Sequence, residues 1–373
     1  MSKIKLATIL GTRPEIIRLA ECIKLCDKHF EHILIHTGQN YDYELNEIFF
    51  EDLDLRRPDF FLNVAGNHLG ETIGNVISKS FEILNKLKPD ALLVLGDTNS
   101  VLSTISAKRL KIPIFHMEAG NRCFDQNVPE EINRKISDHI SDINLAYTEH
   151  SRRYLLSEGF RKDHVFVTGS PLREVLNKYR DNIRNSKIID KLHLKSKDYF
   201  VVSAHREENI DLNDNFQVLV ASLNAVAEKY QKVIIFSTHP RTKNRIIKDK
   251  IAFHSLIKNV SPLGFFDYVK LQQSSYVVLS DSGTISEESA MMGFPAVSIR
   301  TSTERPEAID AGTIVLGGIN TEQILNSIEI VRDMTKYNTT DLPWEYNVIN
   351  SSERVVKVIQ SYTSIVNNMI WGK

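Results

Sequence analysis

Residues able to move protons stand directly behind short apolar runs of the chain. In the first half Asp97 and Glu118 hold such positions, and in the second half His205 and His239 do. Carboxylates and imidazoles are the groups that proteins use most for general acid–base catalysis. Each of these residues could separately be structural, because carboxylates cap helices and histidines fill polar gaps. Their repeated placement behind apolar runs favours a common site.

The segment that begins at Pro129 supplies a third carboxylate. Pro129 suits the first position of a helix, and Glu130 suits its positive end. Alternatively, Glu130 and Arg134 lie four residues apart and form a surface ion pair. In the first interpretation, Glu130 joins Asp97 and Glu118 in an acidic group. A basic group would face it, made of Arg13, Arg18, His205, His239 and Arg305.

Two similar strings each follow an apolar run, Gly11–Glu15 and Gly283–Glu287. Both read as a glycine followed by a T-x-x-E capping box at the start of a helix. They could be well-capped helices only, or helix N-termini that bind an anion. Just beyond the second string, Glu288 could accept the hydroxyls of a ribose. Tyr268 could cover a base, although core packing would also explain an aromatic residue there.

Strands and helices must alternate to position these residues. Short continuous apolar runs are typical of strands buried on both faces of a parallel sheet, and amphipathic stretches lie between them. The expected strands are 4–10, 33–37, 91–95, 112–117, 143–147, 165–168, 199–203, 233–237, 259–262, 276–280, 296–299 and 313–316. The pattern predicts an α/β protein with two doubly wound, Rossmann-type domains, whose strand ends face a central cleft.

A Lys/Arg/Asp-rich stretch with weak periodicity divides the chain. None of the 16 glycines lies between Gly169 and Gly264, which supports a boundary in this region. We expect an N-terminal domain, a linker, a C-terminal domain and a terminal helix that packs back on the first domain. Their boundaries are 1–172, 173–194, 195–340 and 345–373.

Composition excludes several classes of protein. The chain has 373 residues, of which 42% are hydrophobic and 25% charged, so it has the composition of a globular protein. A formal net charge of -1 argues against a nucleic-acid partner. Three cysteines without a C-x-x-C argue against a disulfide scaffold. The chain shows no leader and no apolar run long enough for a membrane span, so we expect a cytoplasmic protein.

Several cofactor motifs are missing from the sequence. There is no G-x-G-x-x-G behind a strand, no G-x-x-x-x-G-K-[ST], and no H-E-x-x-H or Cys/His quartet. These strings would bind a dinucleotide, a nucleoside triphosphate or zinc respectively. We therefore expect a reaction with no cofactor and no metal.

Taken together, the strings resemble the non-hydrolysing UDP-N-acetylglucosamine 2-epimerase family, in family order over nearly the whole chain. They are 11–15, 37–39, 96–98, 116–120, 129–134, 205–208, 280–283 with 287–288, and 303–307. The resemblance implies a GT-B-like pair of domains with a UDP-sugar between them. It implies that the catalytic residues are Asp97, Glu118, Glu130 and His205. It implies that the substrate-binding residues are Arg13, Arg18, Gln39, Arg134, His239, Ser282, Gly283, Glu288 and Arg305.

The resemblance also implies a reaction and a usual assembly. UDP leaves C1 as the C2 proton is removed, which gives a 2-acetamidoglycal, and UDP then adds back with protonation on the other face. Family members are usually homodimers. The rival interpretations are a GT-B glycosyltransferase, a hydrolysing 2-epimerase and a catalytically silent nucleotide-sugar sensor.

Some positions depart from the main pattern of the family. Arg18 stands where Lys is commonest, and Asn40-Tyr41 replaces the usual His, which puts activation by a second UDP-sugar in doubt. Asn99-Ser100 and 120–126 resemble the branch that forms UDP-N-acetyl-L-fucosamine for capsule or O-antigen. We favour that branch, with exchange between UDP-GlcNAc and UDP-ManNAc as the alternative.

Overall fold

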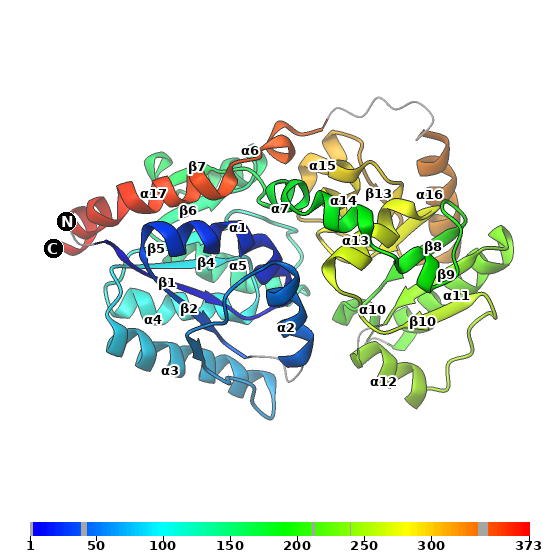
Figure 1. The fold of residues 1–373 in the computed structure, drawn as a ribbon, viewed down its shortest axis with the longest axis horizontal. Helices are drawn as coiled ribbons and strands as arrows, with labels where there is room; N and C mark the ends of the chain where they lie inside the picture. Colours follow the sequence, from blue (N-terminus) through cyan, green and yellow to red (C-terminus); the bar gives the residue numbers. More distant parts are fainter. Residues whose placement is uncertain (1–2, 39–42, 211–212, 239, 335–341) are drawn as a thin grey trace. The chain divides into compact units, whose positions relative to one another are not determined.

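The fold was obtained as a computed structural model that describes residues 3–38, 43–210, 213–238, 240–334 and 342–373 (Figure 1). It divides into two compact units. The N-terminal unit contains residues 1–178 together with 347–373, and the C-terminal unit contains residues 179–346. Each unit is an α/β structure built around its own sheet.

The sheet of the N-terminal unit has seven strands in the order β3-β2-β1-β4-β5-β6-β7, and its neighbouring strands pair in parallel. The strands are β1 (Lys5–Leu10), β2 (Glu31–His36), β3 (Phe60–Phe61), β4 (Ala91–Leu95), β5 (Ile114–Met117), β6 (Ile143–Ala146) and β7 (Val165–Val167). Strands β4, β5 and β6 are buried along their whole length. Burial on both faces explains why these runs are continuously apolar.

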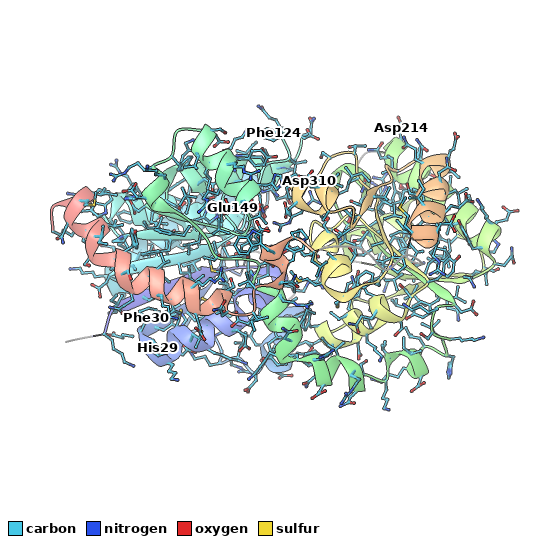
Figure 2. The ribbon with its side chains drawn as sticks, turned by 90° about the horizontal axis from the view of Figure 1, so that it is seen from above. His29, Phe30, Phe124, Glu149, Asp214 and Asp310 are labelled. Carbon is cyan, nitrogen blue, oxygen red and sulfur yellow. The ribbon has the colours of Figure 1, made fainter. Side chains whose placement is uncertain are left out.

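Helices of the N-terminal unit come from both ends of the chain. They are α1 (Arg13–His29), α2 (Tyr43–Asp52), α3 (Leu69–Leu87), α4 (Ser103–Arg109), α5 (Pro129–Ile140), α6 (Glu149–Ser157), α7 (Leu172–Lys178) and α17 (Ser351–Val366), with the short turns η1 (Asn99–Leu102), η2 (Lys162–His164) and η4 (Asn367–Trp371). Helix α17 packs against α1 (Figure 1). It buries Val355 and Ile359. Helix α1 ends at His29, and Phe30 is its C-cap residue (Figure 2).

The C-terminal unit has a six-stranded sheet in the order β10-β9-β8-β11-β12-β13, again with parallel pairings. Its strands are β8 (Tyr199–Ser203), β9 (Val233–Ser237), β10 (Ile257–Val260), β11 (Val277–Ser280), β12 (Ala296–Ser298) and β13 (Val315–Leu316). Its helices are α8 (Arg180–Asn185), α9 (Ile188–Lys191), α10 (Glu207–Ile210), α11 (Asn213–Tyr230), α12 (Pro240–Lys248), α13 (Phe265–Ser274), α14 (Ile285–Met292), α15 (Pro306–Asp310) and α16 (Thr321–Met334), and η3 (Trp344–Asn347) follows them.

Each sheet has one place where the strand order reverses. In the N-terminal unit it lies between β1 and β4, and in the C-terminal unit between β8 and β11. The connections that follow the two central strands leave in opposite directions, so the loops behind them are free to hold a ligand. These two places position the residues described below.

The predicted fold class, α/β with two doubly wound parallel sheets, is confirmed. Strand β3 was not predicted, because two residues are too short to show any periodicity. Strand β10 begins two residues before the expected run 259–262. The expected linker 173–194 contains α8, α9 and all of α7 except its first residue. Within the described part of the chain, no helix is long and apolar enough to cross a membrane.

The prediction of two capping boxes is wrong in detail. Thr12 and Thr284 do occupy the N-cap positions of α1 and α14, but neither side chain makes a capping hydrogen bond. Glu15 instead accepts a hydrogen bond from the Gly11 N–H, and Glu287 forms an ion pair with Arg305. Both glutamates are fully buried, so polar partners in the interior compete successfully with the helix end.

Candidate functional site

Glu118 follows β5 and stands at the centre of a buried polar group. Its backbone has a φ of +62°, which non-glycine residues seldom adopt, so the surrounding structure must hold it there. Its carboxylate is ion-paired with Arg18 from α1 and accepts a hydrogen bond from Asn121 Nδ2 at 3.2 Å. The Arg18 guanidinium also lies 5.7 Å from the centre of the Tyr147 ring. The structure therefore brings Arg18 and Glu118 together.

Asp97 follows β4, the strand next to β5. Its Oδ2 lies 2.5 Å from Nη2 of Arg134, and Nη1 of Arg134 lies 3.0 Å from Glu131 Oε2. A side chain at Gly96 would come within 3.9 Å of Glu118 Oε2, so Glu118 lies against the residue that precedes Asp97. Two carboxylates, each beside an arginine, thus follow neighbouring strands of the sheet.

Helix α5 turns a charged face inward. Its buried residues include Glu131, Arg134 and Asp138, whereas Ile132 is 53% exposed. Glu131 accepts hydrogen bonds from the backbone N–H groups of Cys123 at 3.1 Å and Phe124 at 3.3 Å. These bonds fasten the loop between β5 and α5. The Phe124 side chain itself is exposed (Figure 2).

His116, a buried residue of β5, contacts both the loop behind β4 and helix α5. Its Nε2 lies 2.7 Å from the carbonyl oxygen of Gly96, which can only accept, and its Nδ1 lies 2.9 Å from Asp138 Oδ1. Asp138 also accepts from Arg122 Nη1 at 2.7 Å and from the Gly120 N–H at 3.1 Å. Burial acts to raise the pKa of Asp138, but His116 and Arg122 outweigh it and hold that pKa below its ordinary value. This network fixes the backbone on both sides of Glu118.

Glu15 is a further buried carboxylate beside the same strand ends. It accepts hydrogen bonds from the Gly11 N–H at 3.1 Å, from Thr12 Oγ1 at 2.7 Å and from Thr98 Oγ1 at 3.1 Å. Ser100 donates a fourth bond to its other oxygen. Burial raises the pKa of Glu15 to about 7, against the opposing effect of these bonds.

In the C-terminal unit, Asp281 connects the loops behind β8 and β11. Its Oδ2 accepts from the backbone N–H of His205 at 2.9 Å, from that of Arg206 at 3.0 Å and from Asn209 Nδ2 at 3.1 Å. Its Oδ1 lies 3.4 Å from Nδ1 of His205. The imidazole of His205 is 44% exposed, so Asp281 orients a ring that can still reach a ligand.

Gly283 lies directly against the carboxylate of Glu304, which would have to shift if Gly283 carried a side chain. A Cβ there would lie 2.1 Å from Glu304 Oε1. Glu304 in turn contacts Arg300 at 2.7 Å and Arg206 at 3.5 Å. Next to the glycine, Ser282 Oγ is 2.9 Å from Thr284 Oγ1. Within the string, the Ser282 N–H donates to Ser280 Oγ at 3.1 Å and the Thr284 N–H to Ser282 Oγ at 3.4 Å, and Arg206 Nη2 would lie 3.8 Å from a Cβ at Gly283.

The remaining predicted residues of this unit make defined contacts. Glu288 accepts a hydrogen bond from Gln272 Nε2 at 2.6 Å. Arg305 is buried and its Nη2 lies 3.1 Å from Glu287 Oε2. Tyr268 packs, half-buried, against the apolar core of the unit. His239 lies outside the described residues.

Two further predicted residues of the N-terminal unit lie in the described part of the chain, Arg13 and Glu130. Arg13 lies over the ring of Phe49, with 5.8 Å between the guanidinium carbon and the ring centre. Glu130 is half-buried in the first turn of α5, and Arg134, one turn further along the helix, contacts Asp97 and Glu131. Gln39 lies outside the described residues.

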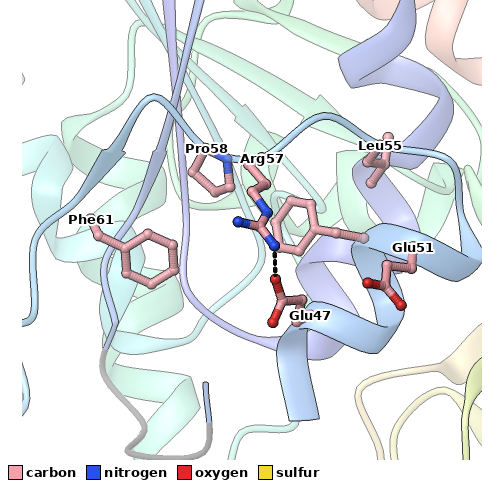
Figure 3. A pocket seen from close by; sticks show the side chains of 7 residues that line it. Glu47, Glu51, Leu55, Arg57, Pro58 and Phe61 are labelled. Atoms are coloured by element: carbon pink, nitrogen blue, oxygen red, sulfur yellow. Dashed lines mark hydrogen bonds and ion pairs between the residues drawn. The ribbon is translucent and has the colours of Figure 1, made fainter. Parts of the chain in front are cut away.

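A small pocket between α2 and β3 contains no predicted site residue (Figure 3). Glu47 and Arg57 form an ion pair at its mouth. Two of its lining rings, Phe50 and Phe61, also pack on His36, and burial lowers the pKa of that histidine to about 4. In the part of the chain that the structure describes, no group of His, Cys, Asp and Glu side chains could hold a metal ion.

Sequence reasoning missed three residues that organise the site: Glu15, Glu131 and Asp281. Glu15 was attributed to a cap, and Asp281 was one of several polar residues behind strands. For Glu131 a signal was available. Charged residues at 131, 134 and 138 have helical spacing, and this pattern places them on one face.

Comparison with known proteins identifies the family. Residues 24–360 match the family described as UDP-N-acetylglucosamine 2-epimerase. The structure of UDP-N-acetylglucosamine 2-epimerase from Rickettsia bellii is similar, with a TM-score of 0.92, 46% identity and coverage of 100% of both chains. The Methanocaldococcus jannaschii UDP-GlcNAc 2-epimerase, solved in complex with UDP-GlcNAc and UDP, has a TM-score of 0.90 and 35% identity over 96% of this chain and 99% of that chain.

A relative with a different sugar also matches. The UDP-2,3-diacetamido-2,3-dideoxy-D-glucuronate 2-epimerase of Pseudomonas aeruginosa is 32% identical, over 87% of this chain and 91% of its own length. The GT-B-like fold implied by the resemblance is confirmed by the two parallel sheets and by the similarity to the solved epimerases. Since the family match covers most of the chain, the protein belongs to the UDP-N-acetylglucosamine 2-epimerase family.

Proposed function

We propose that this protein inverts C2 of a UDP-2-acetamido sugar without hydrolysing it. The observation that carries the proposal is the pair of carboxylates behind β4 and β5, Asp97 and Glu118, each held by an arginine within a family of 2-epimerases. One group removes the C2 proton while the C1–O bond to UDP breaks, which leaves a 2-acetamidoglycal. UDP then adds back to C1 as a proton enters C2 from the other face.

This reaction makes two demands that the described residues support. A leaving diphosphate needs fixed positive charge, which we assign to Arg13, and hydrogen-bond donors, which we assign to Ser282 and Gly283. Proton transfer on two faces of one carbon needs at least two acid–base groups, which we assign among Asp97, Glu118, Glu130 and His205. We further assign UDP-sugar binding to Arg18, Gln39, Arg134, His239, Tyr268, Glu288 and Arg305.

For the sugar, we favour the branch that forms UDP-N-acetyl-L-fucosamine, and UDP-GlcNAc is the alternative. The loop that resembles this branch supports the choice, because its Asn121 donates a hydrogen bond to Glu118 and its Cys123 is fastened by Glu131. The Pseudomonas aeruginosa relative is named for a sugar other than GlcNAc, so sugar choice differs within the family. We also propose a cytoplasmic homodimer that supplies a nucleotide sugar for capsule or O-antigen.

The test is exchange at C2 in D₂O without acceptor or NAD. The protein is incubated with UDP-GlcNAc or with UDP-N-acetyl-L-pneumosamine, and C2 is followed by NMR. Deuterium at C2 with the UDP-sugar conserved is the expected result, and the faster substrate identifies the branch. Free sugar plus UDP would indicate a hydrolysing enzyme, and binding of UDP with no exchange would indicate a sensor or a glycosyltransferase. Either result overturns the proposal.

A matched pair of variants ties the exchange to the site. Glu118→Gln keeps the shape of the side chain but removes its charge and its basicity, so exchange should fall by about 10²–10⁴-fold. Glu82→Gln makes the same change at an exposed position on α3 and should leave exchange unaltered. Equal rates for the two variants would remove Glu118 from the mechanism.

A further inference from the structure

Four hydrogen-bond donors from two separate loops converge on the Glu15 carboxylate. Gly11 and Thr12 belong to the loop behind β1, and Thr98 and Ser100 follow β4. The side chain is fully buried. Four donors meet the hydrogen-bonding capacity of this buried carboxylate. Because they come from both loops, the carboxylate holds the two loops together.

The two loops are far apart in the sequence, and beyond the paired strands that precede them the hydrogen bonds to Glu15 connect one loop to the other. Strands β1 and β4 are neighbours in the sheet, but the chain runs through β2 and β3 between them. Directly beside the donors stand Arg13, which follows Thr12, and Asp97, which precedes Thr98. Whatever holds the two loops together therefore also sets the distance between a proposed diphosphate ligand and a proposed acid–base group.

In the C-terminal unit, too, a buried carboxylate connects the two loops at the place where the strand order reverses. There the strand order reverses between β8 and β11, and Asp281 behind β11 accepts three hydrogen bonds from the loop and short helix behind β8. Asp281 is also fully buried. In each unit a buried carboxylate thus joins the two central loops. This repetition indicates that the contacts of Glu15 serve to position the loops.

We propose that Glu15 is a positioning residue of the epimerisation, whose carboxylate fixes Arg13 relative to Asp97. The inference rests on the proposed function and adds a residue that does not itself contact the sugar. An error of about 1 Å in the placement of a catalytic group can cost about 10²-fold in rate, so a loop clamp affects kcat more than KM.

The protonation state of Glu15 should matter for this role. An ionised carboxylate can accept from all four donors, whereas a protonated one must use an oxygen to donate. The charged groups closest to it in the first turns of α1 are Arg13 and Arg18, whereas the other charged residues of α1 lie further along the helix, from Glu21 to His29. Asp97 lies behind β4, and η1 carries no charged residue. With a pKa of about 7, Glu15 changes its charge within the working range of pH.

The experiment compares Glu15→Gln with a matched control. Glu174→Gln changes a half-buried glutamate of the same unit, whose pKa is also raised by burial and which accepts from the Ser352 N–H at 3.0 Å. The rate of deuterium exchange at C2 is measured across pH 6 to 8, about one unit on either side of the pKa of Glu15. We expect Glu15→Gln to lose about 100-fold in kcat at the upper end, with a much smaller change in KM. The ratio of wild-type to variant rate should rise with pH.

A second variant keeps the carboxylate and removes one donor. Thr98→Val deletes a hydrogen bond that lowers the pKa of Glu15, so the pH at which the rate rises should move upward. Glu174→Gln should leave both the rate and the pH profile unchanged. If Glu15→Gln and Glu174→Gln behave alike, or if Thr98→Val leaves the profile in place, Glu15 is only structural. Absence of exchange in the unaltered protein would instead refute the proposed function.

Discussion

Glu15 carries an ionisable group into the interior of the N-terminal unit, and its charge has opposite effects on stability and on the site. The ionised form satisfies four donors from two loops, as the site requires. Burial nevertheless disfavours that form, which is why the pKa rises to about 7. Functional sites often retain groups that weaken the fold, and stability is then recovered elsewhere.

This conflict predicts how stability depends on pH. The pKa of a glutamate in an unfolded chain is about 4.3, so the folded protein holds this proton more tightly. The stabilisation is fully present below about pH 4 and is lost as the pH rises through about 7, a loss of about 3 kcal/mol. Urea unfolding of wild type and Glu15→Gln at several pH values measures it. The variant should gain relative stability as pH rises, and two parallel curves would contradict the assignment.

Arg134 illustrates a residue whose geometry matters more than its charge. Its two terminal nitrogens contact different carboxylates, Asp97 at 2.5 Å and Glu131 at 3.0 Å. A lysine ammonium is a compact charge without that fork. We expect Arg134→Lys to fold normally and to lose about tenfold or more in C2 exchange, or about 1.4 kcal/mol of transition-state stabilisation. A rate within twofold of wild type would show that charge alone suffices.

At the scale of elements, the strands could be predicted and the polar contacts could not. The runs 199–203 and 233–237 coincide with β8 and β9, because a strand buried on both faces is continuously apolar. The same reasoning predicts where the strands end, and therefore that Asp97 and Glu118 follow neighbouring strands. It could not predict the hydrogen bond between Thr98 and Glu15, because contacts between residues 83 positions apart depend on how the loops are folded.

Gly169 lies where the first segment of the N-terminal unit contacts the last segment, at Val348. It has a φ of +80°, and a Cβ there would lie 2.5 Å from Val348 Cβ. Gly159 has a φ of +92° but no atom within 4 Å of such a Cβ. Gly159→Ala should therefore cost only the backbone strain of about 1–2 kcal/mol. Gly169→Ala should cost roughly 1–3 kcal/mol more because of the overlap. Equal losses in urea unfolding would show that the segment at Val348 moves aside freely.

At the scale of the molecule, the C-terminal unit is one continuous stretch inserted into the N-terminal unit. Helix α17 completes the latter by burying Val355, Ile359 and Val366. Burial of three such side chains contributes roughly 5–9 kcal/mol, which is comparable to the stability of a whole domain.

Removal of residues 347–373 should therefore act on one unit only. In calorimetry the unfolding transition of the N-terminal unit should move to a much lower temperature, while that of the C-terminal unit, whose residues 179–346 stay intact, should remain. Hydrogen exchange assigns each transition to its unit. Equal destabilisation of both units would show that they unfold as one cooperative body.

The same chain order has a consequence for synthesis on the ribosome. After residue 178 has been made, the N-terminal unit must wait for its closing helix until the whole C-terminal unit has been translated. At about 5–20 residues per second, that delay is roughly 10–30 s. During this time the surface of α1 that receives α17 is uncovered, while the later-made unit can already fold. The first half of the polypeptide to leave the ribosome is thus the last to be finished, and it is the half that a nascent-chain chaperone would need to protect.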